Sequence, residues 1–217
     1  SCGAYGRYLG RLEMAGKGKL LKAVSYRMIP ITAAIPQDPK ISGLIAIFRK
    51  EAQKKYLDLF SYRYGQAIAE VAFSLWDFNW EQSERAKMVN SGLGDLVTDA
   101  FRYAVRKIEG DDYREISLAF EGFGQIRAPL ARGDISVNDA FRVLALGKGL
   151  DDLSGYSLVT CWLTGKEIKS LFEIEATLAP ASNNMRLQIT GMRFSYDPKA
   201  PPFYRVRAVE VETADGK

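Results

Sequence analysis

The spacing of apolar residues changes along this chain, and the change limits the folds that the chain can adopt. Across residues 91–110 apolar side chains recur every three or four positions, which is typical of a helix with one buried face. Ser91 can cap the start of this helix and Gly110 can end it. In residues 66–75 the apolar side chains instead fall on alternate positions, the period of a half-buried strand. The chain therefore combines helices with strands.

The first third of the chain continues this mixture. Residues 4–14 and 20–31 predict a pair of strands joined by a turn rich in glycine and lysine. Asp38 followed by Pro39 predicts the N-cap and the first position of a helix that reaches about residue 60.

Two capping boxes mark helices in the second half of the chain. Ser136 with Asp139, and Thr164 with Glu167, have the spacing in which a side chain at each position caps the backbone of the other. The order of elements predicts an α/β (α+β) protein with a mixed sheet and flanking helices. Strands are expected at residues 115–120, 155–163, 186–197 and 203–213.

A few side chains are expected to serve the fold. Cys161 lies in the apolar run of the strand expected at 155–163 and is expected to be a small core residue. Trp76, Trp80 and Trp162 are expected to anchor the core or a domain interface rather than to stack on a ligand. Asp99 borders the apolar stripe of its helix and is expected to make a structural hydrogen bond.

The composition excludes several classes of site. The 217 residues include no histidine, which removes Ser-His-Asp and Cys-His catalysis and histidine zinc sites. Cys2 and Cys161 are the two cysteines, too few for a disulfide framework or a cysteine zinc site. The net charge of +4 does not have the clustered form of a nucleic-acid binder. Nucleic acid is therefore not an expected partner. No run approaches the roughly 18 apolar residues of a membrane helix, so no membrane span is expected.

A glycine-rich loop carries the first chemical signal. The sequence EGFGQIRAPLARGDIS follows an expected strand and brings Gly122, Gly124 and Arg127 within six residues. Glycines let backbone N–H groups approach an anion closely, and an arginine guanidinium is a planar donor for phosphate oxygens. The loop by itself leaves two interpretations open, a phosphate site or a turn whose arginine pairs with a surface carboxylate.

Five motifs occur in a specific order along the chain. They are GAYGRYLGRLEM, SGLGDLVTDAFR, GFGQIRAPLARGDIS, LTGKEIKSLFE and ITGMRFSYDP. Together they resemble the landmarks of the bacterial 5'-nucleotidase and UDP-sugar hydrolase family. The resemblance implies the last strands of a truncated metallophosphoesterase domain at residues 1–36, a connecting helix at 37–64, and a C-terminal substrate-binding domain at 65–217 that lacks its last segment.

The resemblance also implies which residues bind substrate. In the family the glycine-rich loop reads Asn, three Gly, Ile, Arg, and its arginine binds the substrate phosphate. Arg127 matches that arginine, and Gly124 matches a glycine of the pocket. Gly122 stands in place of the asparagine, and Leu146 in place of a phenylalanine that stacks on the nucleobase. These four residues are the expected substrate-binding residues, and no catalytic residue is expected in this chain.

The resemblance places the metal chemistry elsewhere. Members of the family hold two divalent metal ions with Asp, Asn and His residues of the N-terminal domain, so this chain is expected to hold no cofactor of its own. The expected partners are a nucleotide or sugar nucleotide, the N-terminal metallophosphoesterase domain, and a second copy of the chain paired through its N-terminal strands. A periplasmic or cell-surface location is implied by the family.

Two functions compete at this point. In the first, the chain is the substrate-binding part of a metal-dependent phosphohydrolase and is inactive alone. In the alternative, it is a non-catalytic nucleotide-binding or interaction module derived from that family. Phe123 and Gln125, which replace two glycines of the loop, and Leu146 favour the alternative.

Overall fold

The computed structural model describes residues 6–75, 91–182 and 185–211. The chain divides into two compact units, residues 1–52 and residues 53–217. No helix within the described ranges is long and apolar enough to cross a membrane. Each unit is described below by itself.

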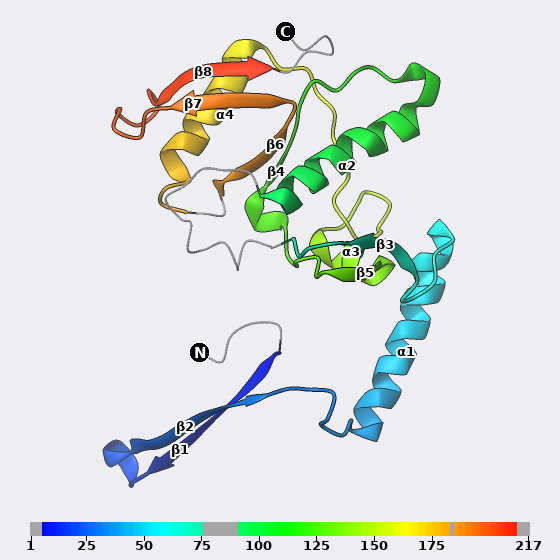
Figure 1. Cartoon of the computed structure of the whole chain (residues 1–217), viewed down its shortest axis with the longest axis vertical. Helices are drawn as coiled ribbons and strands as arrows, with labels where there is room; N and C mark the ends of the chain where they lie inside the picture. The colour runs from blue at the N-terminus through cyan, green and yellow to red at the C-terminus, as the bar shows by residue number, and fades with distance from the viewer. Residues whose placement is uncertain (1–5, 76–90, 183–184, 212–217) are drawn as a thin grey trace. The chain divides into compact units, whose positions relative to one another are not determined.

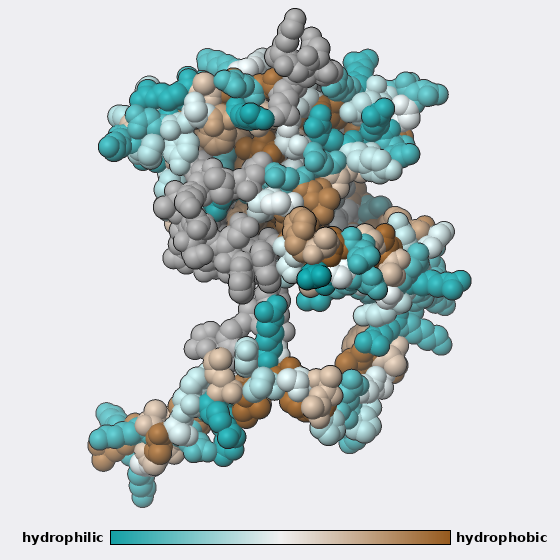
Figure 2. All heavy atoms as spheres, in the orientation of Figure 1, coloured by the Kyte–Doolittle hydropathy of each residue, from teal (hydrophilic) through white to brown (hydrophobic). Residues whose placement is uncertain are grey.

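The first unit contains a hairpin with one apolar face. Leu12 lies opposite Tyr26 and shares a face with Met28, whereas Arg11 and Arg27 lie opposite each other on the other face. Apart from Ile29, which is partly buried, the apolar residues of the hairpin are exposed, and Figure 2 shows apolar surface on this part of the chain. The predicted strand pair is confirmed as the antiparallel strands β1 (Tyr8–Ala15) and β2 (Lys22–Pro30) (Figure 1).

The helix α1 (Pro39–Lys55) begins where the sequence predicted it. The Asp38 carboxylate oxygen Oδ1 accepts hydrogen bonds from the backbone N–H groups of Lys40 at 2.8 Å and Ile41 at 3.1 Å. These bonds satisfy two of the N–H groups that the first turn of a helix leaves without a partner in the helix. Leu44 and Phe48 of α1 are exposed.

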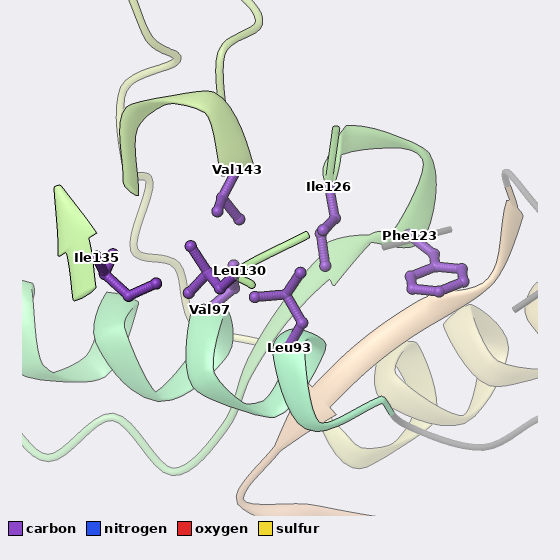
Figure 3. Close-up of a cluster of buried hydrophobic side chains, with 7 residues drawn as sticks. All are labelled: Leu93, Val97, Phe123, Ile126, Leu130, Ile135 and Val143. Carbon is purple, nitrogen blue, oxygen red and sulfur yellow. The ribbon is translucent and has the colours of Figure 1, made fainter. Parts of the chain in front are cut away.

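The first core of the second unit forms on one face of α2 (Gly92–Glu109). The Ser91 hydroxyl accepts a hydrogen bond from the Gly94 N–H at 2.9 Å, so the predicted cap is confirmed. Figure 3 shows Leu93 and Val97 of α2 pointing toward Leu130. The buried cluster comprises Leu93, Val97, Phe123, Ile126, Leu130, Ile135 and Val143.

A second core forms between α4 (Gly165–Leu178) and the last two strands. Phe172 of α4 is 1% exposed and stacks on Phe194 with 4.4 Å between the ring centroids. Both predicted capping boxes are present, with Ser136 at the start of α3 (Val137–Val143) and Thr164 at the start of α4.

The described strands form four two-stranded antiparallel sheets instead of the predicted mixed sheet. The mixture of helices with strands is confirmed, but the single sheet is a correction. Alternation of apolar residues reports that one face of a strand is buried and does not report which edges pair. The pairs are β1–β2, β3 (Ala67–Val71) with β5 (Gly133–Ser136), β4 (Ala119–Gly122) with β6 (Leu187–Thr190), and β7 (Met192–Tyr196) with β8 (Val206–Val211).

The strand predicted at 155–163 is also corrected. This segment forms no strand, Cys161 is exposed, and Trp162 is 82% exposed, so neither is a core residue. Its apolar pattern fits a strand, but a strand needs a paired edge as well as a pattern. Trp76 and Trp80 lie outside the described residues.

The structural role predicted for Asp99 is confirmed. Its carboxylate oxygen Oδ1 accepts a hydrogen bond from the Thr190 hydroxyl at 2.6 Å. This bond joins α2 to the end of β6.

Candidate functional site

The glycine-rich loop is held in place by buried side chains and backbone hydrogen bonds. It leaves β4 at Gly122 and makes one 3₁₀ turn at residues 123–125. Phe123 and Ile126 are each 1% exposed and lie in the α2 core (Figure 3). The Phe123 ring also lies under the Arg186 guanidinium, 5.2 Å from the ring centroid. The loop is therefore held against the core by Phe123, which lies between the two glycines, and by Ile126, which directly precedes Arg127.

The backbone N–H groups of the loop do not form the anion cradle that the glycines suggested. The Gly122 N–H donates to the Glu121 carboxylate at 2.7 Å, and the Phe123 N–H donates to the Arg186 carbonyl at 2.7 Å. The N–H groups of Ile126 and Arg127 donate to the carbonyls of Phe123 at 3.2 Å and Val143 at 2.8 Å. These four donors are therefore used inside the fold. Gly122 has a φ of −65°, which any residue can adopt, so it is not required for a left-handed turn.

Arg127 is the exposed residue of the loop. Its Nη1 donates a hydrogen bond to the Gly124 carbonyl oxygen at 3.1 Å, which keeps the guanidinium beside its own loop. Its backbone is fixed by the bond to Val143, so the base of the side chain is anchored while the charged end reaches solvent. An exposed guanidinium on an anchored backbone can bind a phosphate. An exposed charge of this kind contributes little to protein stability, so the side chain can be replaced without unfolding the protein.

A pocket of about 140 Å³ lies beside the loop. Leu146, expected at the base-stacking position, lines it together with Gln125 of the loop. Arg127, Gly122 and Gly124 are not among its lining residues. The structure therefore brings Leu146 to the loop but does not bring all four predicted residues to one pocket. The lining residues are Phe101, Glu121, Gln125, Leu144, Leu146, Gly155, Tyr156, Ser157 and Leu158.

Two polar groups of this pocket lack full compensation for their burial. The Gln125 side-chain oxygen Oε1 is buried and has no hydrogen-bond partner among the described residues. Burial raises the pKa of the Glu121 carboxyl, and the hydrogen bond from the Gly122 N–H offsets part of that rise. A buried acceptor without a partner costs about 1–3 kcal/mol, and an N–H or O–H group of a ligand can recover that cost.

Gln125 and Tyr156 were missed by sequence reasoning. In the sequence Gln125 stands out only as a residue that replaces a glycine of the loop. Its position in the loop, between Gly124 and Ile126, was the one signal that it could belong to the site. The Tyr156 ring lies against Gly147, where an added Cβ would come within 2.5 Å of ring atoms. Gly147 also has a φ of +89°, so both its conformation and its contact with the ring favour glycine. No pattern in the sequence predicts that contact.

The residues that the structure describes do not form a cluster suited to a dinuclear metal site. Among residues 6–75, 91–182 and 185–211, no group of three or more His, Cys, Asp or Glu side chains is placed to hold a metal ion. The sequence contains no histidine. The pocket offers an amide oxygen from Gln125, a carboxyl from Glu121 and the rings of Phe101 and Tyr156, and the loop beside it offers the Arg127 guanidinium.

Comparison with known proteins identifies the family. The family model described as "5'-nucleotidase, C-terminal domain" matches residues 68–217. The chain is 23% identical over 215 residues to the trifunctional nucleotide phosphoesterase protein YfkN of Bacillus subtilis (strain 168), covering 98% of this chain and 13% of the relative. It is 25% identical over 215 residues to the snake venom 5'-nucleotidase of Macrovipera lebetinus, covering 96% of this chain and 48% of the relative.

A solved structure gives the same relationship. The crystal structure of the 5'-nucleotidase precursor from Thermus thermophilus matches with a TM-score of 0.58 and 27% sequence identity, covering 97% of this chain and 37% of that chain. The chain thus spans less than half the length of each of these relatives. The match of the family model over residues 68–217 covers more than half of the chain, and the chain belongs to the 5'-nucleotidase C-terminal domain family.

Proposed function

We propose that this chain is the substrate-binding C-terminal part of a 5'-nucleotidase-like phosphohydrolase and binds a nucleotide or sugar nucleotide. The observation that carries the proposal is the pocket in which Leu146 meets Gln125, next to the loop that bears Arg127. In this proposal Arg127 binds the phosphate, Leu146 contacts the base, and Gly122 and Gly124 keep the loop compact. The substrate class is supported by the similar proteins, which are 5'-nucleotidases and a nucleotide phosphoesterase.

The charges of the site favour a phosphate bound at Arg127 and a nucleoside bound in the pocket. The pocket presents the unpartnered Gln125 oxygen and the half-buried Glu121 carboxyl, which are both acceptors. Acceptors suit the N–H groups of a base or the hydroxyls of a sugar, and a carboxylate repels a phosphate. The Arg127 guanidinium is the complementary cation of the loop. The nucleoside part therefore fits the pocket better than the phosphate does.

The same proposal assigns the rest of the molecule. Residues 1–36 are the last strands of a metallophosphoesterase domain, residues 37–64 are the connecting helix, and residues 65–217 are the substrate-binding domain. Two divalent metal ions are held by the N-terminal part of the full-length protein. The exposed apolar face of the β1–β2 hairpin packs against that part or a second copy of the chain. We also propose a periplasmic or cell-surface location and a role in nucleotide catabolism, with the family relationship as support, and nucleic acid is not proposed as a partner.

The alternative is a nucleotide-binding or interaction module without catalysis. The observation that favours it is that four N–H groups of the loop donate inside the fold, which weakens phosphate binding relative to an open cradle. The two functions differ in phosphate affinity and in turnover, which the next two experiments measure.

Arg127→Ala is expected to reduce the affinity for adenosine 5'-monophosphate while leaving the fold intact. A charge-assisted bond to phosphate is worth roughly 1.5–3 kcal/mol, which corresponds to a loss of about tenfold to a hundredfold. Leu146→Phe is expected to raise the affinity, because stacking of a base on an aromatic ring contributes about 1–3 kcal/mol. Isothermal titration calorimetry on the parent and both variants measures these changes.

Arg132→Ala is the matched control for charge. Arg132 is also exposed and follows Arg127 by five residues, but it lies outside residues 122–127, which hold Gly122, Gly124 and Arg127. It is expected to change the affinity less than about threefold, because an exposed charge at that distance is largely screened. Equal losses for Arg127→Ala and Arg132→Ala would show that the loop has no specific phosphate site.

The chain alone, supplied with zinc or manganese ions and adenosine 5'-monophosphate, is expected to release no phosphate above background. A dinuclear site needs several well-placed donors, and this sequence has no histidine. A phosphate-release assay on the purified chain, beside a full-length product with an N-terminal domain, makes the comparison. Metal-dependent turnover by the chain alone would contradict the proposal that this chain binds substrate while the N-terminal part holds the metal ions.

A further inference from the structure

A groove of about 800 Å³ lies in the second unit, next to the candidate site. One wall is formed by residues 114–121, which lead into and include most of β4, and the other by the extended segment 157–163. Phe101 and Val105 of α2 contribute to the lining between them. Figure 1 draws the segment 157–163 as the yellow coil that precedes α4.

The segment 157–163, called the strap below, has the sequence of a strand without the environment of one. Its apolar residues include Val159, which is 83% exposed, and Trp162, which is 82% exposed. No strand and no backbone hydrogen bond to another segment is recorded for the strap among the described residues. Exposed apolar side chains and unpaired backbone groups on one segment favour pairing with an open sheet edge.

The opposite wall supplies such an edge. β4 pairs with β6 along one side, with Phe120 opposite Ile189, and β6 is its one partner strand in the described part of the chain. The described strands leave the other edge of β4 unpaired, and Ala119, Phe120 and Glu121 of β4 line the groove that the strap also lines. Phe120 is itself exposed. The groove therefore separates two backbone edges that can pair with each other.

The strap also reaches the candidate site. Ser157 and Leu158 line both the groove and the pocket that contains Gln125 and Leu146. Phe101 and Glu121 are likewise shared by the two cavities. A movement of the strap toward β4 thus moves residues of the pocket wall.

We propose that residues 157–163 close onto the open edge of β4 as a third strand, filling the groove and completing one wall of the pocket. Closure satisfies the backbone groups of both walls and removes Val159 or Trp162 from water, depending on which face of the strap meets α2. The closure does not depend on the proposed nucleotide site. The statement about the pocket wall rests on the proposed function.

Cysteine cross-linking tests the closure without any ligand. In a Cys2→Ser background Cys161 is the one remaining thiol, and Leu118→Cys, Ala119→Cys and Phe120→Cys are each added in turn. Residues directly opposite in paired strands have Cα atoms about 4.5–5.5 Å apart, within disulfide range, and neighbouring residues point to opposite faces. If the strap closes, the disulfide yield of Ala119→Cys in a glutathione buffer is expected to differ by at least about fivefold from the yields of Leu118→Cys and Phe120→Cys.

The control and a second measurement keep the result interpretable. Tyr103→Cys, an exposed position of α2 outside the groove lining, is expected to cross-link poorly to Cys161. Hydrogen exchange on the unmodified chain is expected to show protected amides within residues 157–163. Only alternate N–H groups of an edge strand are paired, so one of the variants Thr160→Pro and Val159→Pro removes a paired N–H. That variant is expected to abolish the protection. Uniformly low yields together with unprotected strap amides would overturn the closure.

Calorimetry on the cross-linked and reduced protein then tests the pocket wall. The affinity for adenosine 5'-monophosphate is expected to differ at least about fivefold between the two forms, because closure moves Ser157 and Leu158. Equal affinities would overturn the pocket-wall statement while leaving the closure intact. If neither form binds the nucleotide, the proposed function fails, the pocket-wall statement fails with it, and the cross-link yields still decide the closure.

Discussion

Glu175→Gln is expected to stabilise the protein at pH 8 by about 2 kcal/mol and to change little at pH 5. Glu175 lies on α4, is 4% exposed, and uses only one carboxylate oxygen, which accepts a hydrogen bond from the Leu187 N–H at 3.0 Å. Its other oxygen Oε2 is buried and finds no hydrogen-bond partner within the described part of the chain. Burial raises the pKa of Glu175 to about 7, and the Leu187 N–H and the nearby Arg186 charge offset part of that rise.

The sign of the pH dependence follows from the raised pKa. Between about pH 4.5 and 7 the folded protein keeps a proton on Glu175 that the unfolded chain has released, so the free energy of unfolding falls as the pH rises through this window. Each unit of pKa difference corresponds to about 1.4 kcal/mol, which makes the total on the order of 3 kcal/mol. Glutamine keeps an acceptor for Leu187 but buries an amide, which costs part of this gain. The net expectation is therefore about 2 kcal/mol.

Urea denaturation followed by circular dichroism at pH 5 and pH 8 measures the effect as the difference between variant and parent. Glu173→Gln is the matched control on the same helix. Both carboxylate oxygens of Glu173 accept backbone hydrogen bonds, from Arg205 at 2.7 Å and Val206 at 2.9 Å, so this variant is expected to be destabilised at both pH values. Parallel pH profiles for the parent and Glu175→Gln would show that Glu175 has the same pKa in the folded and unfolded protein, so that burial does not raise it.

Gly191→Ala is expected to destabilise the protein by about 3 kcal/mol or more. Gly191 joins β6 to β7 with a φ of +83°, a conformation that costs an alanine about 1–2 kcal/mol. A Cβ at this position would lie 2.0 Å from the Ser117 carbonyl oxygen and 3.2 Å from the Leu118 Cα. Both neighbours are backbone atoms just before β4, so relief of the clash requires the chain to move.

Gly65→Ala separates the strain of the backbone from the clash. Gly65 has a φ of +76°, and nothing lies within 4 Å of an added Cβ, so this variant is expected to lose only about 1 kcal/mol. Urea denaturation of both variants at one pH gives the two free energies of unfolding. A loss for Gly191→Ala no larger than that for Gly65→Ala would show that residues 117–118 yield to the added methyl group at little cost.

The start of each long helix was predictable because its signals are local. The caps at Asp38, Ser91 and Thr164 involve hydrogen bonds that span two or three residues, so the sequence contains both partners in order. The core face of α2 was predictable for the same reason, since its apolar residues repeat with the period of the helix. Neither inference needed contacts from distant parts of the chain.

The candidate site was predictable only in part. Motif resemblance led to Leu146, which lines the pocket, and to Arg127, which is exposed on the loop; their roles in binding stay predictions. Gln125 and Tyr156 were not predicted, because the pocket is assembled from α2, the glycine-rich loop, the residues after α3 and the start of the strap. The geometry at which these segments meet is set by the two buried cores rather than by the motif of any one segment.

The sequence by itself determined which segments are helices, where those helices begin, and that the chain mixes them with strands. The tertiary structure alone decided which strand edges pair and that residues 157–163 pair with no other described segment. It also decided that Glu175 is buried with one oxygen that no described residue satisfies. Periodicity and capping depend on groups within about four residues of one another, so the sequence displays them directly. Edge pairing and desolvation depend on groups that are distant along the chain and adjacent only after folding, which no local pattern records.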